Sequence, residues 1–209
     1  MDQFQLMLSS PANMALLGAN VVLSVMAFGD VRLMDRMMFD VGKIRRNGEW
    51  YRWVTSGFVH GDPMHLFMNM LALFFLGPAL EFAVGTWTYL AIYLAALAGG
   101  SLWTYMEHFR DFNYRALGAS GAVSGITTAA AVFYPLSTIR VFFALPMPFI
   151  LFATLYIGWS AWASASRVRD GIGHSAHLGG ALTGLVLVCI FWPRVVQVSW
   201  DEIVRAVLP

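Results

Sequence analysis

The fold of this chain is decided by residues 64–106, which read MHLFMNMLALFFLGPALEFAVGTWTYLAIYLAALAGGSLWTYM. Glu81 is the one Asp, Glu, Lys or Arg residue in this stretch. A helix crosses the hydrocarbon core of a bilayer with about 20 residues. The two halves, Met64–Val84 and Thr86–Met106, are each long enough and are separated only by Gly85. We therefore expect a tight antiparallel hairpin of two membrane-spanning helices.

Four further stretches are similarly long and apolar: Ala12–Phe28, Leu117–Tyr134, Val141–Trp162 and Ile172–Trp192. The whole chain of 209 residues is 58% hydrophobic and only 12% charged, about half the charge of an average soluble domain. Strands of a membrane barrel would alternate polar and apolar residues, which these stretches do not. The sequence therefore predicts an all-α integral membrane protein with a bundle of six transmembrane helices.

The predicted organisation is a short N-terminal tail over residues 1–11, a membrane domain over 12–192 and a short C-terminal tail over 193–209. The connection over residues 29–63 is long and mixes charges with methionine, tryptophan and tyrosine. It could be a disordered loop, but its amphipathic rings favour a segment embedded in the membrane interface. The one cysteine, Cys189, excludes an internal disulfide, and a net charge of +1 gives no reason to expect nucleic acid. No pattern specifies an oligomeric state.

Polar residues inside membrane spans are costly, so each is a functional candidate. Here they gather where the even-numbered spans begin, and even-numbered spans of a six-helix bundle start on the same side of the membrane. The three sets therefore lie at a similar depth: His60, His65 and Asn69; Gly118, Ser120 and Gly121; His174, His177 and Gly180.

A serine and a histidine at matched depth indicate nucleophilic catalysis, because a serine hydroxyl needs a neighbouring base to take its proton. Ser120 is the favoured nucleophile and His177 the favoured base, with Ser124 and His174 as the rivals on the same helices. His65 and Asn69 are four residues apart, so they share a helix face. Both could support an oxyanion together with the Ser120 N–H group.

Small residues on two spans would let the helices approach closely enough for this chemistry. They are Gly118, Gly121 and Gly125 on the fourth span, and Gly180 and Gly184 on the sixth.

These residues resemble the motifs of the rhomboid intramembrane serine proteases. The pattern HxxxxHxxxN is met by His60, His65 and Asn69, GxSG by residues 118–121, and AHxxGxxxG by Ala176, His177, Gly180 and Gly184. The resemblance covers about residues 49–184. It implies a Ser120–His177 dyad, oxyanion support from His65 and Asn69, and a structural or water-handling role for His60. Arg52 matches the arginine of a tryptophan-arginine signature in the first connection, and Glu81 resembles a glutamate that ends the second span.

The resemblance further implies a bacterial inner-membrane enzyme that cleaves transmembrane protein substrates without a metal or organic cofactor. Two positions depart from the family pattern. Tyr51 replaces the tryptophan of the signature, and Ser124 stands where an aromatic residue often stacks on the catalytic histidine. A catalytically weak, client-binding relative is the alternative. A transporter would line a path through the midplane, whereas these polar groups cluster near one face.

Two arguments about orientation disagree. With a cytoplasmic N-terminus, the active-site side would carry ten basic residues and the cytoplasmic side only Arg140, Arg194 and Arg205, which the positive-inside rule disfavours. The resemblance implies that orientation nonetheless, with the active site opening to the periplasmic or extracellular face, and we expect it. The ten residues are Arg32, Arg36, Lys43, Arg45, Arg46, Arg52, Arg110, Arg115, Arg167 and Arg169.

Overall fold

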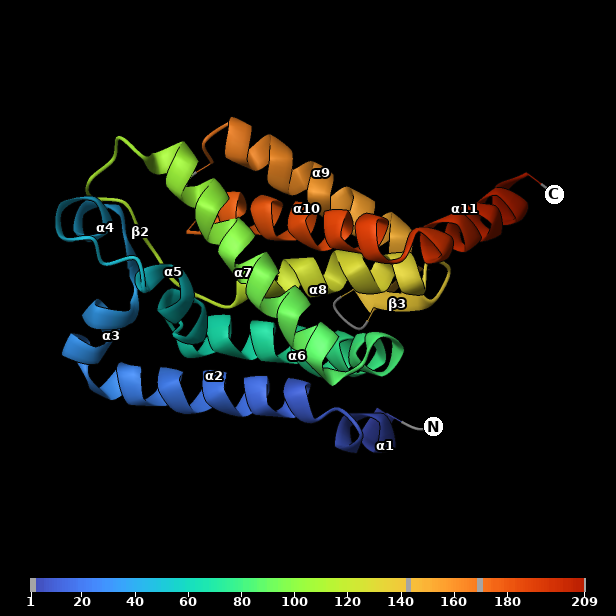
Figure 1. The fold of residues 1–209 in the computed structure, drawn as a ribbon, viewed down its shortest axis with the longest axis horizontal. Coiled ribbons are helices and arrows are strands. Elements are labelled where there is room, and N and C mark those ends of the chain that lie inside the picture. Colours follow the sequence, from blue (N-terminus) through green and yellow to red (C-terminus); the bar gives the residue numbers. More distant parts are fainter. Residues whose placement is uncertain (1–2, 142–143, 169–170, 209) are drawn as a thin grey trace.

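The computed structural model describes residues 3–141, 144–168 and 171–208, most of which are helical (Figure 1). Two short antiparallel strand pairs, β1 with β2 and β3 with β4, lie outside the helices. In chain order the elements are α1 Gln3–Leu8, α2 Pro11–Gly29, α3 Val31–Met37, β1 Phe39–Asp40, α4 Val41–Asn47, α5 Arg52–Thr55, the 3-10 helix η1 Ser56–Phe58, α6 Pro63–Val84, α7 Thr86–His108, β2 Arg115–Ala116, α8 Ser120–Phe133, β3 Thr138–Val141, β4 Leu145–Pro148, α9 Phe149–Ala165, α10 His174–Phe191 and α11 Pro193–Val207.

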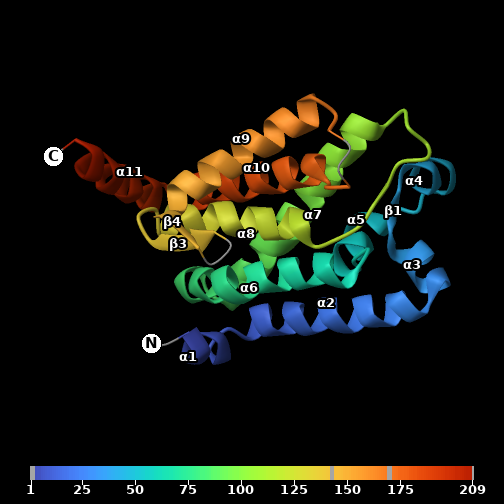
Figure 2. The same ribbon diagram turned by 180° about the vertical axis from the view of Figure 1, so that it is seen from behind.

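Six apolar helices of the described residues form the body of the protein. In both ribbon views α2, α6, α8, α10 and α9 lie side by side in that order, and α7 crosses over α8 and α10 (Figure 1, Figure 2). Four of the six, α2, α6, α7 and α10, are long and apolar enough to cross a membrane, and α8 and α9 are shorter apolar helices. The bundle expected from the sequence is confirmed.

Helix α8 occupies the centre of the bundle. Its sequence, SGAVSGITTAAAVF, consists mainly of small residues, and all but Ser120, Val123 and Phe133 are buried. Small side chains let neighbouring helices approach on several sides at once. The first residue of α8, Ser120, is therefore at the end of the most enclosed helix.

Large apolar side chains cover the outside of the bundle. Examples from four helices are Val25, Phe82, Leu155 and Phe191, which are 58%, 62%, 57% and 66% exposed. A protein surrounded by water rarely exposes so much contiguous apolar surface, whereas lipid accepts it. The outer surface is that of a multi-pass integral membrane protein.

The polar side chains of α2, Asn13, Asn20 and Ser24, are buried, and each makes at least one hydrogen bond. The Glu81 carboxylate of α6 accepts from the backbone N–H groups of Ala12 and Asn13, at 3.0 and 2.8 Å, and so caps the N-terminus of α2. The Tyr89 hydroxyl donates to Asn13 Oδ1 at 2.7 Å. Glu81 thereby joins the C-terminal part of α6 to the start of α2, and these two helix ends lie at the end of the bundle away from the start of α8 (Figure 1).

The connection between α6 and α7 agrees with the prediction. Gly85 alone joins the two helices, and its φ of +82° is one that residues with a side chain rarely adopt. The fourth span was expected from Leu117, but α8 begins at Ser120, because Gly118 has a φ of +118° that no helix accommodates.

The fifth predicted span began too early. Residues 138–141 and 145–148 pair as the hairpin β3–β4, and α9 begins at Phe149 rather than at Val141; residues 142 and 143 lie outside the described residues. Pro146 and Pro148 have no backbone N–H to donate to a helix. Hydropathy does not register a missing amide hydrogen, so the expected helix over 141–148 is wrong.

The long first connection is ordered. It contains α3, β1, α4, α5 and η1, and β1 pairs with β2 through Phe39–Ala116 and Asp40–Arg115. Trp50 packs in T-shaped contacts against Trp53 and Tyr105, and Trp53 lies tilted against Tyr105. The ring centroids are 5.5–5.7 Å apart, and these contacts fix the connection to α7. A disordered loop is excluded for this segment, and its position in the membrane interface remains a prediction.

The two segments expected as tails contain helices. α1 precedes the first span, and α11 packs at the far end of α8, where the Ser199 hydroxyl donates to the Val132 carbonyl. Residues 1, 2 and 209 lie outside the described residues.

Candidate active site

Ser120 follows a turn whose backbone is held from several sides. The Gly118 N–H donates to the Ser56 carbonyl at 2.9 Å, and the preceding strand β2 pairs with β1. A β-carbon added to Gly118 would stand 2.6 Å from His65 Cε1, in addition to the strain of a φ of +118°. Glycine is therefore required at position 118, and the turn presents Ser120 at the N-terminus of α8. The first N–H groups of a helix have no acceptor within it, which suits this end for a developing anion.

His60 supports the same turn from the other side. It is fully buried, its Nε2 accepts from the Ala119 N–H at 3.3 Å, and its Nδ1 lies 2.9 Å from Ser24 Oγ. An accepting Nε2 requires the neutral ring with its proton on Nδ1, donated to Ser24. Burial lowers the pKa of His60 to about 4, which keeps the ring neutral near pH 7. His60 thus links α2 to the residue that precedes Ser120.

His65 and Asn69 lie one turn apart on α6. The His65 imidazole lies against Gly118, and its ring centroid is 5.0 Å from that of His60. Asn69 is buried, and its Nδ2 donates to the His65 carbonyl at 2.9 Å. The structure brings His65 beside the turn before Ser120 and gives Asn69 a hydrogen bond within its own helix.

Helix α10 meets α8 beside Ser120 through backbone contacts. A β-carbon on Gly180 would stand 2.0 Å from the Gly121 carbonyl oxygen, and one on Gly121 would stand 3.2 Å from the Ala176 carbonyl oxygen. Gly121 therefore lies between Ala176 and Gly180, the turn of α10 that carries His177. The close approach continues one turn on, where a β-carbon on Gly184 would be 2.3 Å from the Gly125 carbonyl oxygen.

The two rival residues have defined surroundings. Ser124 is 1% exposed, and its hydroxyl donates to the Ser120 carbonyl at 2.6 Å. His174 is 4% exposed and packs edge-on against Trp159 and His177, with centroid distances of 6.4 and 6.1 Å. Both are less accessible than the half-buried Ser120 and His177.

A small cavity of about 40 Å³ opens beside Ser120. Its walls come from the first connection, α7, the turn before α8 and the start of α10, including Ser56, Ser101, Gly118, Ser120, Gly173 and Ala176. It could admit a water molecule or a small side chain next to the hydroxyl. Within residues 3–141, 144–168 and 171–208, no group of three His, Cys, Asp or Glu side chains could hold a metal ion.

Comparison with protein-family models matches residues 47–194 to the Rhomboid domain. The chain belongs to the rhomboid family. Among curated proteins it is 29% identical over 195 residues to RHOMBOID-like protein 12, mitochondrial, of Arabidopsis thaliana, covering 85% of this chain and 55% of that protein. It is 28% identical over 179 residues to Rhomboid protease AarA of Providencia stuartii, covering 76% of this chain and 62% of that protein.

A third relative, Rhomboid protein 1, mitochondrial, of Saccharomyces cerevisiae, is 32% identical over 139 residues, which are 64% of this chain and 39% of the yeast protein. The chain thus spans less than two thirds of the length of these rhomboid relatives. They come from a bacterium and from mitochondria alike, so the family specifies a multi-pass membrane protein without specifying which membrane.

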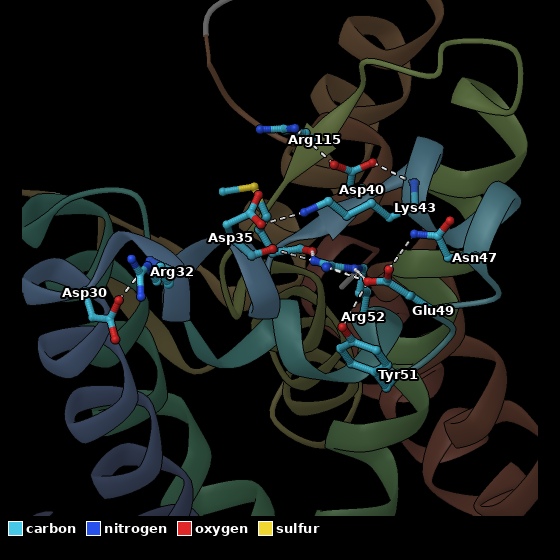
Figure 3. Close-up of polar contacts among 11 residues, drawn as sticks. Asp30, Arg32, Asp35, Asp40, Lys43, Asn47, Glu49, Tyr51, Arg52 and Arg115 are labelled. Atoms are coloured by element: carbon cyan, nitrogen blue, oxygen red, sulfur yellow. Dashed lines mark hydrogen bonds and ion pairs between the residues drawn. The ribbon is translucent and has the colours of Figure 1, made fainter.

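Arg52 holds the first connection of this rhomboid domain together. Its guanidinium is buried and donates to the carbonyls of Asp35 and Met38 at 2.7 Å each, and its Nη2 lies 2.6 Å from Glu49 Oε2 (Figure 3). Tyr51, at the departure from the family signature, donates to the same carboxylate at 3.0 Å. One arginine therefore fixes α3, the α3–β1 junction and the start of α5.

The Glu49 carboxylate gives this network a predictable pH dependence. Hydrogen bonds from Asn47 and Arg52 lower the pKa of Glu49 from 4.5 to about 2. Because the folded pKa is depressed, the contribution of Glu49 is complete above pH 4.5 and is lost as the pH falls toward 2. We expect Glu49→Gln to lower the midpoint of thermal unfolding by a few degrees at pH 7, and the difference from wild type to shrink below pH 4.5.

The measurement is thermal unfolding of detergent-solubilised protein, followed by tryptophan fluorescence between pH 7 and pH 3. Glu202→Gln, on an exposed glutamate of α11, is the matched control and should differ from wild type at no pH. A Glu49→Gln deficit that is the same at pH 7 and pH 3 would contradict the assignment.

Sequence reasoning missed several residues that the structure brings to this site. Ser24 and Ser56 hold the turn before Ser120, and Glu107 of α7 accepts from Ser164 at 2.6 Å and from Ser175 at 2.8 Å, which joins α7 to α9 and α10. Tyr156 reaches Ser124 from α9. Polar residues within an apolar helix are a general signal of function, but α9 also carries Thr154 and Ser160, so this signal alone does not single out Tyr156 or Ser164.

Proposed function

We propose that this rhomboid is a serine endopeptidase that cleaves transmembrane segments of other membrane proteins, with Ser120 as nucleophile and His177 as base. The observation that carries the proposal is the contact of Gly121 with Ala176 and Gly180. It sets the residue after the serine against the helical turn that contains the histidine. The motifs of the family and the enclosed N-terminus of α8 support the same roles.

In the proposed mechanism Ser120 Oγ attacks the scissile carbonyl carbon while His177 takes the hydroxyl proton. The negative charge moves to the carbonyl oxygen, which the Ser120 N–H, His65 and Asn69 would stabilise. His177 then gives the proton to the leaving amine, and an acyl-enzyme remains on Ser120. A water molecule, deprotonated by His177, hydrolyses this ester and restores the serine.

A catalytically weak relative that binds membrane clients is the second candidate, because Ser124 and Tyr51 depart from the family pattern. A fluorophosphonate separates the two functions, since it forms a covalent adduct only with an activated serine. We expect detergent-solubilised protein to be labelled at Ser120 and to cut a model transmembrane substrate. A folded protein that binds the substrate but does neither would favour the client-binding function.

His65→Ala and Asn69→Ala test the proposed oxyanion support. Loss of one oxyanion donor typically lowers kcat by ~10²–10³, and we expect a fall of that order for each variant. Both should still react with a small phosphonate faster than His177→Ala does, because the nucleophile and base remain. Wild-type turnover in both variants would mean that these residues only join α6 to its neighbours.

The orientation that we propose places Ser120 toward the periplasmic face of a bacterial inner membrane. Three of the basic residues that count against this orientation under the positive-inside rule are ion-paired. They are Lys43 Nζ with Asp35 at 2.5 Å, Arg52 with Glu49 at 2.6 Å and Arg115 with Asp40 at 3.0 Å (Figure 3). Acids of the first connection are thus paired with three of the ten basic residues, so this segment differs from the simple loops to which the positive-inside rule applies. Arg169, which also counts toward that charge, lies outside the described residues.

A cysteine placed at the exposed residue Asn47, in a Cys189→Ala background, tests the orientation. We expect it to react with a membrane-impermeant maleimide added outside intact cells. Ser137→Cys is the matched control, because Ser137 is exposed beyond the opposite end of α8 and should react only after lysis. The reverse labelling pattern would place the active site on the cytoplasmic side.

A further inference from the structure

Tyr156 of α9 connects the two residues of the proposed dyad. Its ring centroid lies 5.8 Å from that of His177, with the planes tilted by 31°, and its hydroxyl lies 2.5 Å from Ser124 Oγ. Ser124 Oγ in turn lies 2.6 Å from the Ser120 carbonyl. One tyrosine therefore touches the imidazole of the base and, through Ser124, the backbone of the nucleophile.

The direction of the hydrogen bonds follows from the number of protons. Ser124 has one hydroxyl proton, and the Ser120 carbonyl can only accept it. The Tyr156 hydroxyl must then donate to Ser124 Oγ. This chain of two hydrogen bonds fixes the distance between α9 and the first turn of α8.

The ring of Tyr156 is also held within its own helix. Phe152, one turn earlier, stacks on it with a centroid distance of 6.0 Å and an angle of 13°. The neighbouring inward residues of α9 are small, namely Ala153, Ser160 and Ala163, which are all buried. Tyr156 is the large side chain that fills the space between α9 and the α8–α10 contact at the level of His177.

We infer that Tyr156 is the positioning residue for the His177 imidazole, and that the setting of the base consequently depends on where α9 lies. The inference rests on the proposed function. At position 124 the side chain is too small to reach His177, and Tyr156 supplies the aromatic surface from a different helix. Movement of α9 away from α8 would break the bond to Ser124 and withdraw the ring from His177 together.

The test distinguishes the effect of the aromatic ring of Tyr156 from the effect of its side-chain volume. Tyr156→Phe keeps the ring and loses the bond to Ser124, so kcat for a transmembrane substrate should fall only a few-fold. Tyr156→Leu keeps apolar bulk without a ring, and kcat should fall by about 10- to 100-fold, the range expected when a catalytic group is misplaced by up to 1 Å. KM should change less than twofold in both, since Tyr156 is not proposed to bind substrate.

The rate of fluorophosphonate labelling should fall in parallel with kcat, because it depends on His177 but not on recognition of a substrate helix. The double variant Tyr156→Ala with Ser124→Phe restores an aromatic ring from α8. It should recover part of the rate that is lost in Tyr156→Ala. This comparison tests the inference even if Tyr156→Leu does not fold. Leu155→Ala, on an exposed neighbour in α9, should behave as wild type.

Two results would overturn the inference. One is that Tyr156→Leu has the same kcat and labelling rate as Tyr156→Phe. The other is that the double variant is no faster than Tyr156→Ala. Failure of the proposed function has a different signature. Wild-type protein would then show no Ser120-dependent labelling or cleavage at all, whatever residue stands at position 156.

Discussion

Ser120→Ala is expected to abolish cleavage of a model transmembrane substrate while the protein remains folded. The oxygen that is lost is the atom proposed to attack the substrate, and none of the remaining groups replaces it. The hydroxyl is half-buried beside glycines, so its removal leaves a negligible void. Cleavage in detergent or liposomes and covalent labelling by a fluorophosphonate should both fall to background, and the midpoint of thermal unfolding should stay near that of wild type.

Ser137→Ala is the matched control, because Ser137 is exposed beyond the opposite end of α8. This variant should cleave substrate at the wild-type rate. Cleavage by Ser120→Ala at more than a few per cent of the wild-type rate would contradict the assignment of Ser120 as nucleophile. Ser124 would then be the serine to examine, although its hydroxyl is already donated to the Ser120 carbonyl.

Gly180→Ala is expected to be the most damaging conservative substitution in the bundle. The new methyl group would stand 2.0 Å from the Gly121 carbonyl oxygen and 3.0 Å from its α-carbon, and both are backbone atoms that cannot rotate away. α8 and α10 must then separate. Overpacking of this kind typically costs about 1–3 kcal/mol. Displacement of the base from the nucleophile by 1 Å can cost ~10² in rate.

We therefore expect Gly180→Ala to unfold at lower temperature and to cleave substrate at least tenfold more slowly. Gly158→Ala is the matched control, because a β-carbon there meets no atom within 4 Å and Gly158 is likewise inside a helix. It should match wild type in both measurements. A Gly180→Ala variant with wild-type stability and activity would mean that α8 and α10 are farther apart than the structure places them.

Much of the fold was predictable because lipid imposes a strong constraint on composition. The hairpin of α6 and α7 around Gly85 follows from length and hydropathy, and the positions of α2 and α10 agree with the apolar stretches to within a few residues. These features depend on residues close together in the chain. The fourth span was predicted only to within three residues, from Leu117 rather than Ser120, because the positive φ of Gly118 cannot be read from hydropathy.

What sequence reasoning missed depends on how the helices are rotated about their axes. Nothing in the sequence of α9 indicates that Tyr156, rather than Trp159 or Trp162, points at the α8–α10 contact. The partners of Tyr156, Ser124 and His177, lie on two other helices. The β3–β4 hairpin was missed for a different reason, because the residues around Pro146 are as apolar as a membrane helix.

The pairing of β1 with β2 has a consequence for the order in which the protein is made. β1 is synthesised well before its partner strand, with α6 and α7 between them, and the turn before Ser120 is complete only when both are present. His177 follows later still, on α10. In a growing chain Ser120 is therefore present before the residue that we propose as its base. In the proposed mechanism, Ser120 would gain its base only once α10 has been made, so a partly built chain would not yet cleave its neighbours.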